Sequence, residues 1–321
     1  MSSTDPPPAK RQRTDDAPVA TRSKLWNDDG NVVLQAVNTQ FRVHWKVHWS
    51  VLMRDSSVFS DLRGLPQPPG KPLVEGCPIM EISDDPLDVE YLLKALYIPS
   101  FHCQKLLPFP VVRALIRLGR KYDFKYLYDS AVARLTTLFP ATLKGYDVSY
   151  STIEVYNGLT RDVISFARKN DILSVLPAAY HFLLSHETTI RLFQGAVRND
   201  GTWAVLPPLD LVKCIIGRER LFKTQFQPGY TLGWLRKWDF KDCTSLKPCR
   251  KSREAVLASF VDANLQDGLI TPESIFARGF LFCSGCRQHI RESTEAGRTK
   301  MWQALPSFFD LPAWDELKNG D

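Results

Sequence analysis

The chain has 321 residues, of which 44% are hydrophobic and 24% are charged, and its formal net charge is +6. This composition is typical of an ordinary globular protein with room for two domains. No stretch approaches the roughly 18 apolar residues of a membrane-spanning helix, so no membrane partner is expected. The basic residues near the start are not followed by an apolar segment, which predicts a protein of the nucleus, the cytoplasm or both. In that reducing environment the seven cysteines are expected to be thiols or metal ligands, not disulfides.

Residues 1–22 are predicted to form a disordered tail, because they are rich in proline, serine and charged residues and offer little apolar surface beyond Val19. Within this tail Lys10, Arg11 and Arg13 follow three prolines. An exposed basic cluster of this kind is a candidate nuclear-import signal. A basic patch that only aids solvation is the alternative.

The next part of the chain has the pattern of a small α+β domain. Two β-rich runs, residues 31–36 and 40–44, predict a hairpin, because apolar and polar residues alternate in the second run. Residues 51–62 have helical character, and residues 79–82 predict a further strand. This order differs from the regular β-α alternation of a doubly wound sheet.

Helices dominate the chain after this strand. Asp85 is a favourable N-cap and Pro86 fits the first helical position, so a helix is expected to begin there. Two more helices are expected from about residues 110 and 124. Beyond residue 145 the pattern stays mostly helical, with prolines as punctuation, but residues 226–249 are rich in Trp, Gly and Lys and have no clear period. The punctuating prolines are Pro177, Pro207 and Pro208.

Several segments, taken together, are similar to BTB/POZ domains. Residues 28–34 and 41–44 resemble the opening hairpin of these domains. Residues 47–52 (VHWSVL) and 56–59 (SSVF) resemble the run that follows the hairpin, and residues 118–123 (LGRKYD) resemble a segment near the end of the domain.

The whole chain also resembles a group of fungal BTB-domain proteins, which share a loop like residues 65–69 (LPQPP) and an ending like residues 305–314. One departure is a tandem repeat, VHWK at residues 43–46 and VHWS at residues 47–50, where one copy is normal. The following residues favour His48 as the histidine of the family position. The repeat also accounts for the presence of both His44 and His48, so these histidines are not interpreted as a pair of metal ligands.

The resemblance implies a BTB/POZ-like domain at residues 23–145, followed by a family-specific helical region at residues 146–321. It implies a homodimer formed through the hairpin and the first helices. Many relatives also recruit a cullin-type ubiquitin ligase scaffold through the helices after the third strand. The residues expected at the dimer contact are Trp26, Val32, Leu34, Leu52, Phe59 and Leu62. Those expected on the partner surface are Tyr91, Lys94, Tyr97 and Phe101.

Two pairs of cysteines in the last third of the chain form a candidate metal site. Cys283 and Cys286 have the two-residue spacing that lets both thiolates reach one tetrahedral zinc ion, while the gap from Cys243 to Cys249 is looser. His289 is the substitute ligand if a cysteine of the first pair does not reach the ion. The prediction is one structural zinc ion, and unpaired thiols are the alternative.

Residues 236–253 are rich in Lys and Arg next to tryptophans, a composition that can bind nucleic acid. Such a run is more often a solvated surface, so nucleic acid is not expected as a partner. A nuclear DNA-associated regulator using this segment and the cysteines is nevertheless the first alternative function.

Enzyme signatures are missing from the sequence. It has no glycine-rich dinucleotide fingerprint, no phosphate loop and no nucleophile elbow, so no catalytic residue is assigned. An enzyme of unrecognised type is the second alternative. The preferred prediction is a protein-interaction adaptor that dimerises through its N-terminal domain and binds an unidentified protein through its C-terminal region.

Overall fold

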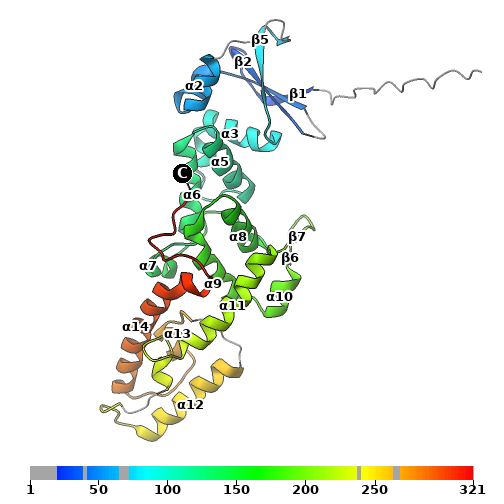
Figure 1. Cartoon of the computed structure of the whole chain (residues 1–321). Helices are drawn as coiled ribbons and strands as arrows, with labels where there is room; N and C mark the ends of the chain where they lie inside the picture. Colours follow the sequence, from blue (N-terminus) through cyan, green and yellow to red (C-terminus); the bar gives the residue numbers. More distant parts are fainter. Residues whose placement is uncertain (1–19, 39–41, 65–71, 237–239, 263–267, 321) are drawn as a thin grey trace, which may run out of the picture. The chain divides into compact units, whose positions relative to one another are not determined.

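The computed structural model describes residues 20–38, 42–64, 72–236, 240–262 and 268–320. The predicted nuclear-import residues Lys10, Arg11 and Arg13 lie outside this part of the chain. Contacts divide the chain into two compact units, the first comprising residues 1–103 and 121–126, and the second residues 104–120 and 127–321. Both contain helices, and the first also contains the main sheet, as Figure 1 shows. The expected boundary after residue 145 does not coincide with this division and remains a prediction.

The N-terminal unit is built on a five-stranded sheet with the strand order β1-β3-β2-β5-β4. Strands β2 and β3 form the predicted antiparallel hairpin, and β5 pairs with β2 in parallel. The α+β prediction for this part of the chain is confirmed. The strands are β1 (Ala20–Trp26), β2 (Val32–Val37), β3 (Arg42–Val47), β4 (Leu73–Val74) and β5 (Cys77–Ile82).

Strand β1 was not predicted, and it corrects the extent of the disordered tail. Its first residues, Ala20, Thr21 and Arg22, pair in parallel with Arg42 and the residues after it in β3. Most β1 side chains are exposed, so the strand depends on backbone hydrogen bonds and leaves little hydrophobic pattern in the sequence.

The helical run expected at residues 51–62 is two helices, α1 (Trp49–Arg54) and α2 (Ser57–Gly64). Ser56 lies at the break, where its hydroxyl donates a hydrogen bond to the carbonyl of Tyr122 and accepts one from the backbone N–H of Phe59. The next helix, α3 (Pro86–Tyr97), begins as predicted, with the Asp85 side chain accepting a hydrogen bond from the N–H of Leu87 at 2.9 Å. A short helix, α4 (Pro99–His102), follows.

The second unit is mostly helical, as predicted, with one short antiparallel ribbon of β6 and β7 that was not foreseen. The prolines at 177 and 208 lie in the first turns of α9 and α11, where the missing N–H is not needed. In the described part of the chain no helix is long and apolar enough to span a membrane. The remaining elements of the chain, of which α5 and α6 each reach into the first unit, are α5 (Phe109–Lys121), α6 (Lys125–Leu138), α7 (Leu143–Asp147), α8 (Leu159–Lys169), η1 (Leu173–Val175), α9 (Leu176–His186), α10 (Thr189–Gln194), β6 (Ala196–Val197), β7 (Trp203–Ala204), α11 (Pro208–Gln225), η2 (Gly233–Leu235), α12 (Leu246–Asp262), α13 (Pro272–Phe276) and α14 (Ser284–Phe308).

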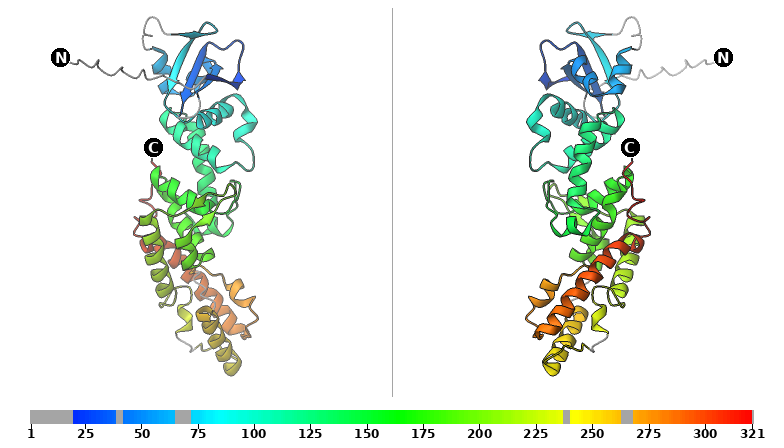
Figure 2. Two further views of the ribbon diagram at one scale, coloured as in Figure 1. Left: turned by 90° about the vertical axis from the view of Figure 1, so that its right-hand side faces the viewer. Right: turned by 90° about the vertical axis from the view of Figure 1, so that its left-hand side faces the viewer.

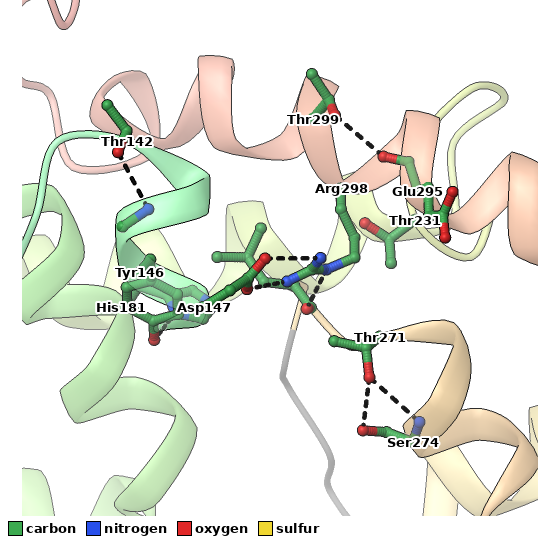
Figure 3. Close-up of polar contacts among 12 residues, drawn as sticks. Thr142, Tyr146, Asp147, His181, Thr231, Thr271, Ser274, Glu295, Arg298 and Thr299 are labelled. Atoms are coloured by element: carbon green, nitrogen blue, oxygen red, sulfur yellow. Dashed lines mark hydrogen bonds and ion pairs between the residues drawn. The ribbon is translucent and has the colours of Figure 1, made fainter. Parts of the chain in front are cut away.

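Among the helices of the described residues α14 is the longest, and it packs along α11 in the second unit (Figure 2). Arg298 fixes its middle by donating to the carbonyl of Leu269 at 2.8 Å and to the carboxylate of Asp147, at the end of α7, at 2.5 Å (Figure 3). Trp302, one turn further on, donates from its indole to the carbonyl of Ala141. The first turn of α14 is therefore attached to a well-anchored helix.

Candidate metal centre

Four cysteines from two separate segments meet at the N-terminal end of α14. Cys243 lies in a turn closed by a hydrogen bond from its N–H to the carbonyl of Phe240, at 3.1 Å. Cys249 lies in the first turn of α12. Cys283 is the N-cap of α14 and Cys286 lies in its first turn.

The four Sγ atoms all lie within 4.8 Å of one another. Tetrahedral zinc with bonds of about 2.3 Å places its sulfur ligands roughly 3.8 Å apart, so the cluster has a suitable size for one ion. All of these cysteines are free thiols. The prediction that the two pairs come together is confirmed to the extent that the four thiols form one group that could hold a metal ion.

Gly285 allows the two segments to approach each other. A Cβ atom at this position would lie 2.5 Å from the carbonyl oxygen of Asp242, the residue before Cys243. Since real Cβ atoms do not approach a backbone oxygen so closely, any side chain here would push the segments apart. The glycine of the Cys-Ser-Gly-Cys motif thus has a long-range role as well as a local one.

Hydrogen bonds and burial act in opposite directions on the thiols. The backbone N–H of Cys286 donates to the sulfur of Cys283 and, with Thr244, lowers the pKa of this half-buried thiol to about 5. Burial raises the pKa of Cys249 and of Cys286. The fully buried thiols therefore need a cation beside them to be ionised together, and a bound metal ion would supply it.

An apolar core surrounds the cysteine cluster. Cys249 and Cys286 are 0% exposed and belong to this core, which α12, α13, α14 and η2 form together. The apolar surroundings exclude water from the sulfur atoms and would favour thiolate ligation of a soft or borderline ion. The other buried members of this apolar core are Leu232, Trp234, Leu235, Val256, Phe260, Ile270, Ile275, Phe282 and Ile290.

His289, the predicted substitute ligand, lies outside the group of four. It is exposed on α14, its ring centroid lies 3.7 Å from that of Phe240, and its Nε2 is 3.2 Å from the hydroxyl of Ser293. The four cysteines form the group without it.

Most residues predicted at the dimer contact belong instead to the core of the N-terminal unit. Val32, Leu34, Leu52 and Phe59 are each 0–1% exposed, because the hydrophobic positions that carry the resemblance are those that hold the domain together. These four side chains therefore face the interior of the unit, and the dimer contact itself stays a prediction. Trp26 and Leu62 are half-buried and accessible.

The residues predicted on the partner surface are half-buried and lie close together. The rings of Tyr91 and Phe101 stack with centroids 6.4 Å apart, and Lys94 forms an ion pair with Glu90 at 3.3 Å. The hydroxyl of Tyr97 accepts a hydrogen bond from the N–H of His48. These contacts shape the surface without assigning it a partner.

Comparison with known proteins gives no further information: no family model, no curated protein and no solved structure matches the chain.

Proposed function

We propose that this chain is a non-enzymatic adaptor that acts through a BTB/POZ-type domain at residues 23–145 and holds one structural zinc ion in its C-terminal region. The order of elements in the N-terminal unit carries the proposal: hairpin β2–β3, helices α1 and α2, strand β5 parallel to β2, and then α3. Segments that resemble BTB/POZ domains fall on these elements, residues 47–52 at the junction of β3 with α1 and residues 56–59 at the start of α2.

The proposed homodimer would use exposed surface near the first helices, because the core residues are out of reach. Met53, Val58 and Leu62 are apolar side chains of α1 and α2 that stay partly exposed. Burying such residues against a second copy would be favourable, and a two-fold contact would bring the same surface from both copies together.

The molar mass of the full chain in solution tests the dimer. The wild-type protein should have twice its chain mass of 36.5 kDa at micromolar concentration, and Leu62→Glu should halve the measured mass. Leu87→Glu is the matched control, because Leu87 lies in α3 of the same unit and is 54% exposed. A monomeric wild-type protein would remove the dimer from the proposal.

Recruitment of a cullin-type scaffold is the second part of the adaptor proposal. The stacked pair Tyr91 and Phe101, with Lys94 beside it on α3, offers a partly apolar surface of the kind that tight contacts use. A purified cullin should co-elute with the wild-type chain but not with Phe101→Ala. Equal co-elution of this variant would place the contact elsewhere.

The proposed zinc ion has a structural role, since four thiolate ligands fill a tetrahedral site and leave no open position for a substrate. The purified chain should contain one zinc ion per molecule, measured by elemental analysis. The double variant of Cys283→Ser with Cys286→Ser should contain none. Cys103→Ser, an exposed cysteine outside the group, should keep the metal. Metal-free wild-type protein that stays folded would refute the zinc proposal.

A further inference from the structure

The four cysteines of the candidate metal site differ in their exposure. Cys249 and Cys286 are 0% exposed, whereas Cys243 and Cys283 are half-buried. Each of the two segments therefore contributes one accessible thiol and one buried thiol. A reagent dissolved in water meets Cys243 and Cys283 first.

The two accessible cysteines also lie outside the helices. Cys243 lies in a turn, and Cys283 is the residue that precedes α14. Cys249 and Cys286 lie in the first turns of α12 and α14 and belong to the apolar core. The Sγ atoms of all four lie within 4.8 Å of one another, and a disulfide requires a separation of about 2.05 Å. The gap that an accessible pair must close is therefore short.

A cleft of about 600 Å³ gives small molecules a route toward the cluster. Asp242, the residue before Cys243, and Gly285, which lies between Cys283 and Cys286, are both part of its lining. The other walls of the cleft come from the loop before η2, from η2 itself and from α14. Hydrogen peroxide is little larger than a water molecule, so it fits a space of this size.

We propose that the candidate zinc site is an oxidant-sensitive switch, in which hydrogen peroxide joins Cys243 and Cys283 in a disulfide and releases the zinc ion. This inference rests on the zinc site of the proposed function. Cysteine reacts with oxidants as its thiolate, the same form that binds the metal. The difference in exposure then selects which two of the four thiolates react.

The reaction balances with peroxide as the two-electron oxidant. One accessible thiolate attacks a peroxide oxygen, the O–O bond breaks, and a sulfenic acid and a hydroxide ion form. The second accessible thiolate attacks the sulfenic sulfur, the S–S bond forms, and another hydroxide ion leaves. Two protons from the solvent convert both hydroxide ions into water. Zinc, which has lost two of its four ligands, leaves as Zn²⁺, and two further protons convert the thiolates of Cys249 and Cys286 into thiols.

The switch changes the structure as well as the metal content. The disulfide ties the turn at Cys243 to the start of α14, while Cys249 and Cys286 lose the ion that joined them. The apolar core that α12, α13, α14 and η2 form around this pair is then no longer held by metal bonds. A reductant with added zinc reverses both steps, because a disulfide can be reduced to two thiols.

Zinc release from the full-length chain tests the proposal. The Cys103→Ser protein is the starting material, because it lacks the exposed cysteine outside the group. It is loaded with zinc, its metal content is measured, and hydrogen peroxide is added together with a chromogenic chelator. One zinc ion should be released for each disulfide formed. Peptide mass spectrometry after thiol alkylation should find Cys243 joined to Cys283, and a reductant with zinc should restore the loaded form.

Cys243→His in the same background is the diagnostic variant, since imidazole can replace a thiolate on zinc but cannot form a disulfide. It should hold zinc and release it at least about tenfold more slowly, because a sulfenic acid at Cys283 has no second accessible thiolate to react with. Ser284→Ala is the matched control, an exposed residue beside the same cysteines, and should release zinc at the unsubstituted rate. If Cys243→His holds no zinc, the disulfide mapped in the unsubstituted cluster decides the case.

The outcomes separate the switch from the zinc site. A chain that holds no zinc before oxidation would overturn both. A loaded chain that keeps its zinc in peroxide would overturn the switch alone. A disulfide that contains Cys249 or Cys286 would also overturn it, as would zinc release from Cys243→His at the rate of Ser284→Ala.

Discussion

Replacing Gly285 by alanine is the sharpest test of the way the two cysteine pairs meet. The added Cβ would lie 2.5 Å from the carbonyl oxygen of Asp242 and 3.2 Å from its carbonyl carbon. Because both atoms belong to the backbone, no rotation of a side chain can relieve the contact. The segment of Cys243 must move away from α14, and the four thiolates can no longer approach one ion as closely.

The expected magnitude follows from the size of this clash. Forcing an extra methyl group into a closely packed site costs about 1–3 kcal/mol. If that strain falls on the metal-bound form, zinc affinity drops between about fivefold and about 150-fold. Alanine is also a better helix former than glycine by up to about 1 kcal/mol. The zinc affinity is therefore expected to fall even though the first turn of α14 becomes more stable.

A competition titration of zinc against a chromogenic chelator measures the change. Ser284→Ala is the matched control, because Ser284 is exposed, adjoins the same cysteines and gains the same residue type. Its zinc affinity should equal that of the wild type. A Gly285→Ala protein with wild-type affinity would refute the reasoning, since the two segments would then not need to approach through this glycine.

Three further predictions concern stability. Arg298→Met removes the ion pair with Asp147 and the hydrogen bond to the carbonyl of Leu269. The free energy of unfolding should fall by about 1–3 kcal/mol in a denaturant titration. An unchanged midpoint of that titration would contradict this prediction. Asp85→Ala removes the cap of α3 and should cost about 1 kcal/mol in the same assay. Burial raises the pKa of both Tyr122 and Tyr180. Both phenols then stay protonated in the folded chain while unfolded tyrosine ionises near pH 10, so stability should be full below about pH 10 and fall above it. Tyr122→Phe should flatten that fall.

Local signals in the sequence predicted the elements that depend on local interactions. Helix α3 follows from Asp85 and the proline after it, because the cap and the first turn are adjacent in the chain. The division of α1 from α2 does not follow from local signals. It depends on the hydrogen bond from Ser56 to Tyr122, which lies 66 residues away. Strand β1 left no signal in the sequence, because its mostly exposed side chains do not alternate between apolar and polar residues.

The candidate metal site was more predictable than the cleft beside it. The two-residue spacing of Cys283 and Cys286 indicates that both thiolates can reach one metal ion. Cys243 and Cys249 could then be proposed as the other two ligands, because they are the same residue type. The cleft joins Tyr230, Phe240 and His289 from three separate segments. None of these residues is unusual in its own neighbourhood, so only the packing of α14 on the preceding loop brings them together.

The short segment of residues 121–126 gives the chain an interleaved organisation. It belongs to the first unit, although the residues on both sides of it belong to the second. Phe124 is 1% exposed, and the rings of Tyr122 and Phe59 lie 4.9 Å apart. An expression product that stops at residue 103 would therefore lack part of its own core and expose Phe59 to water. Neither unit can be exchanged between proteins together with its partner through a single crossover, because any single cut in the gene separates residues that belong to the same unit.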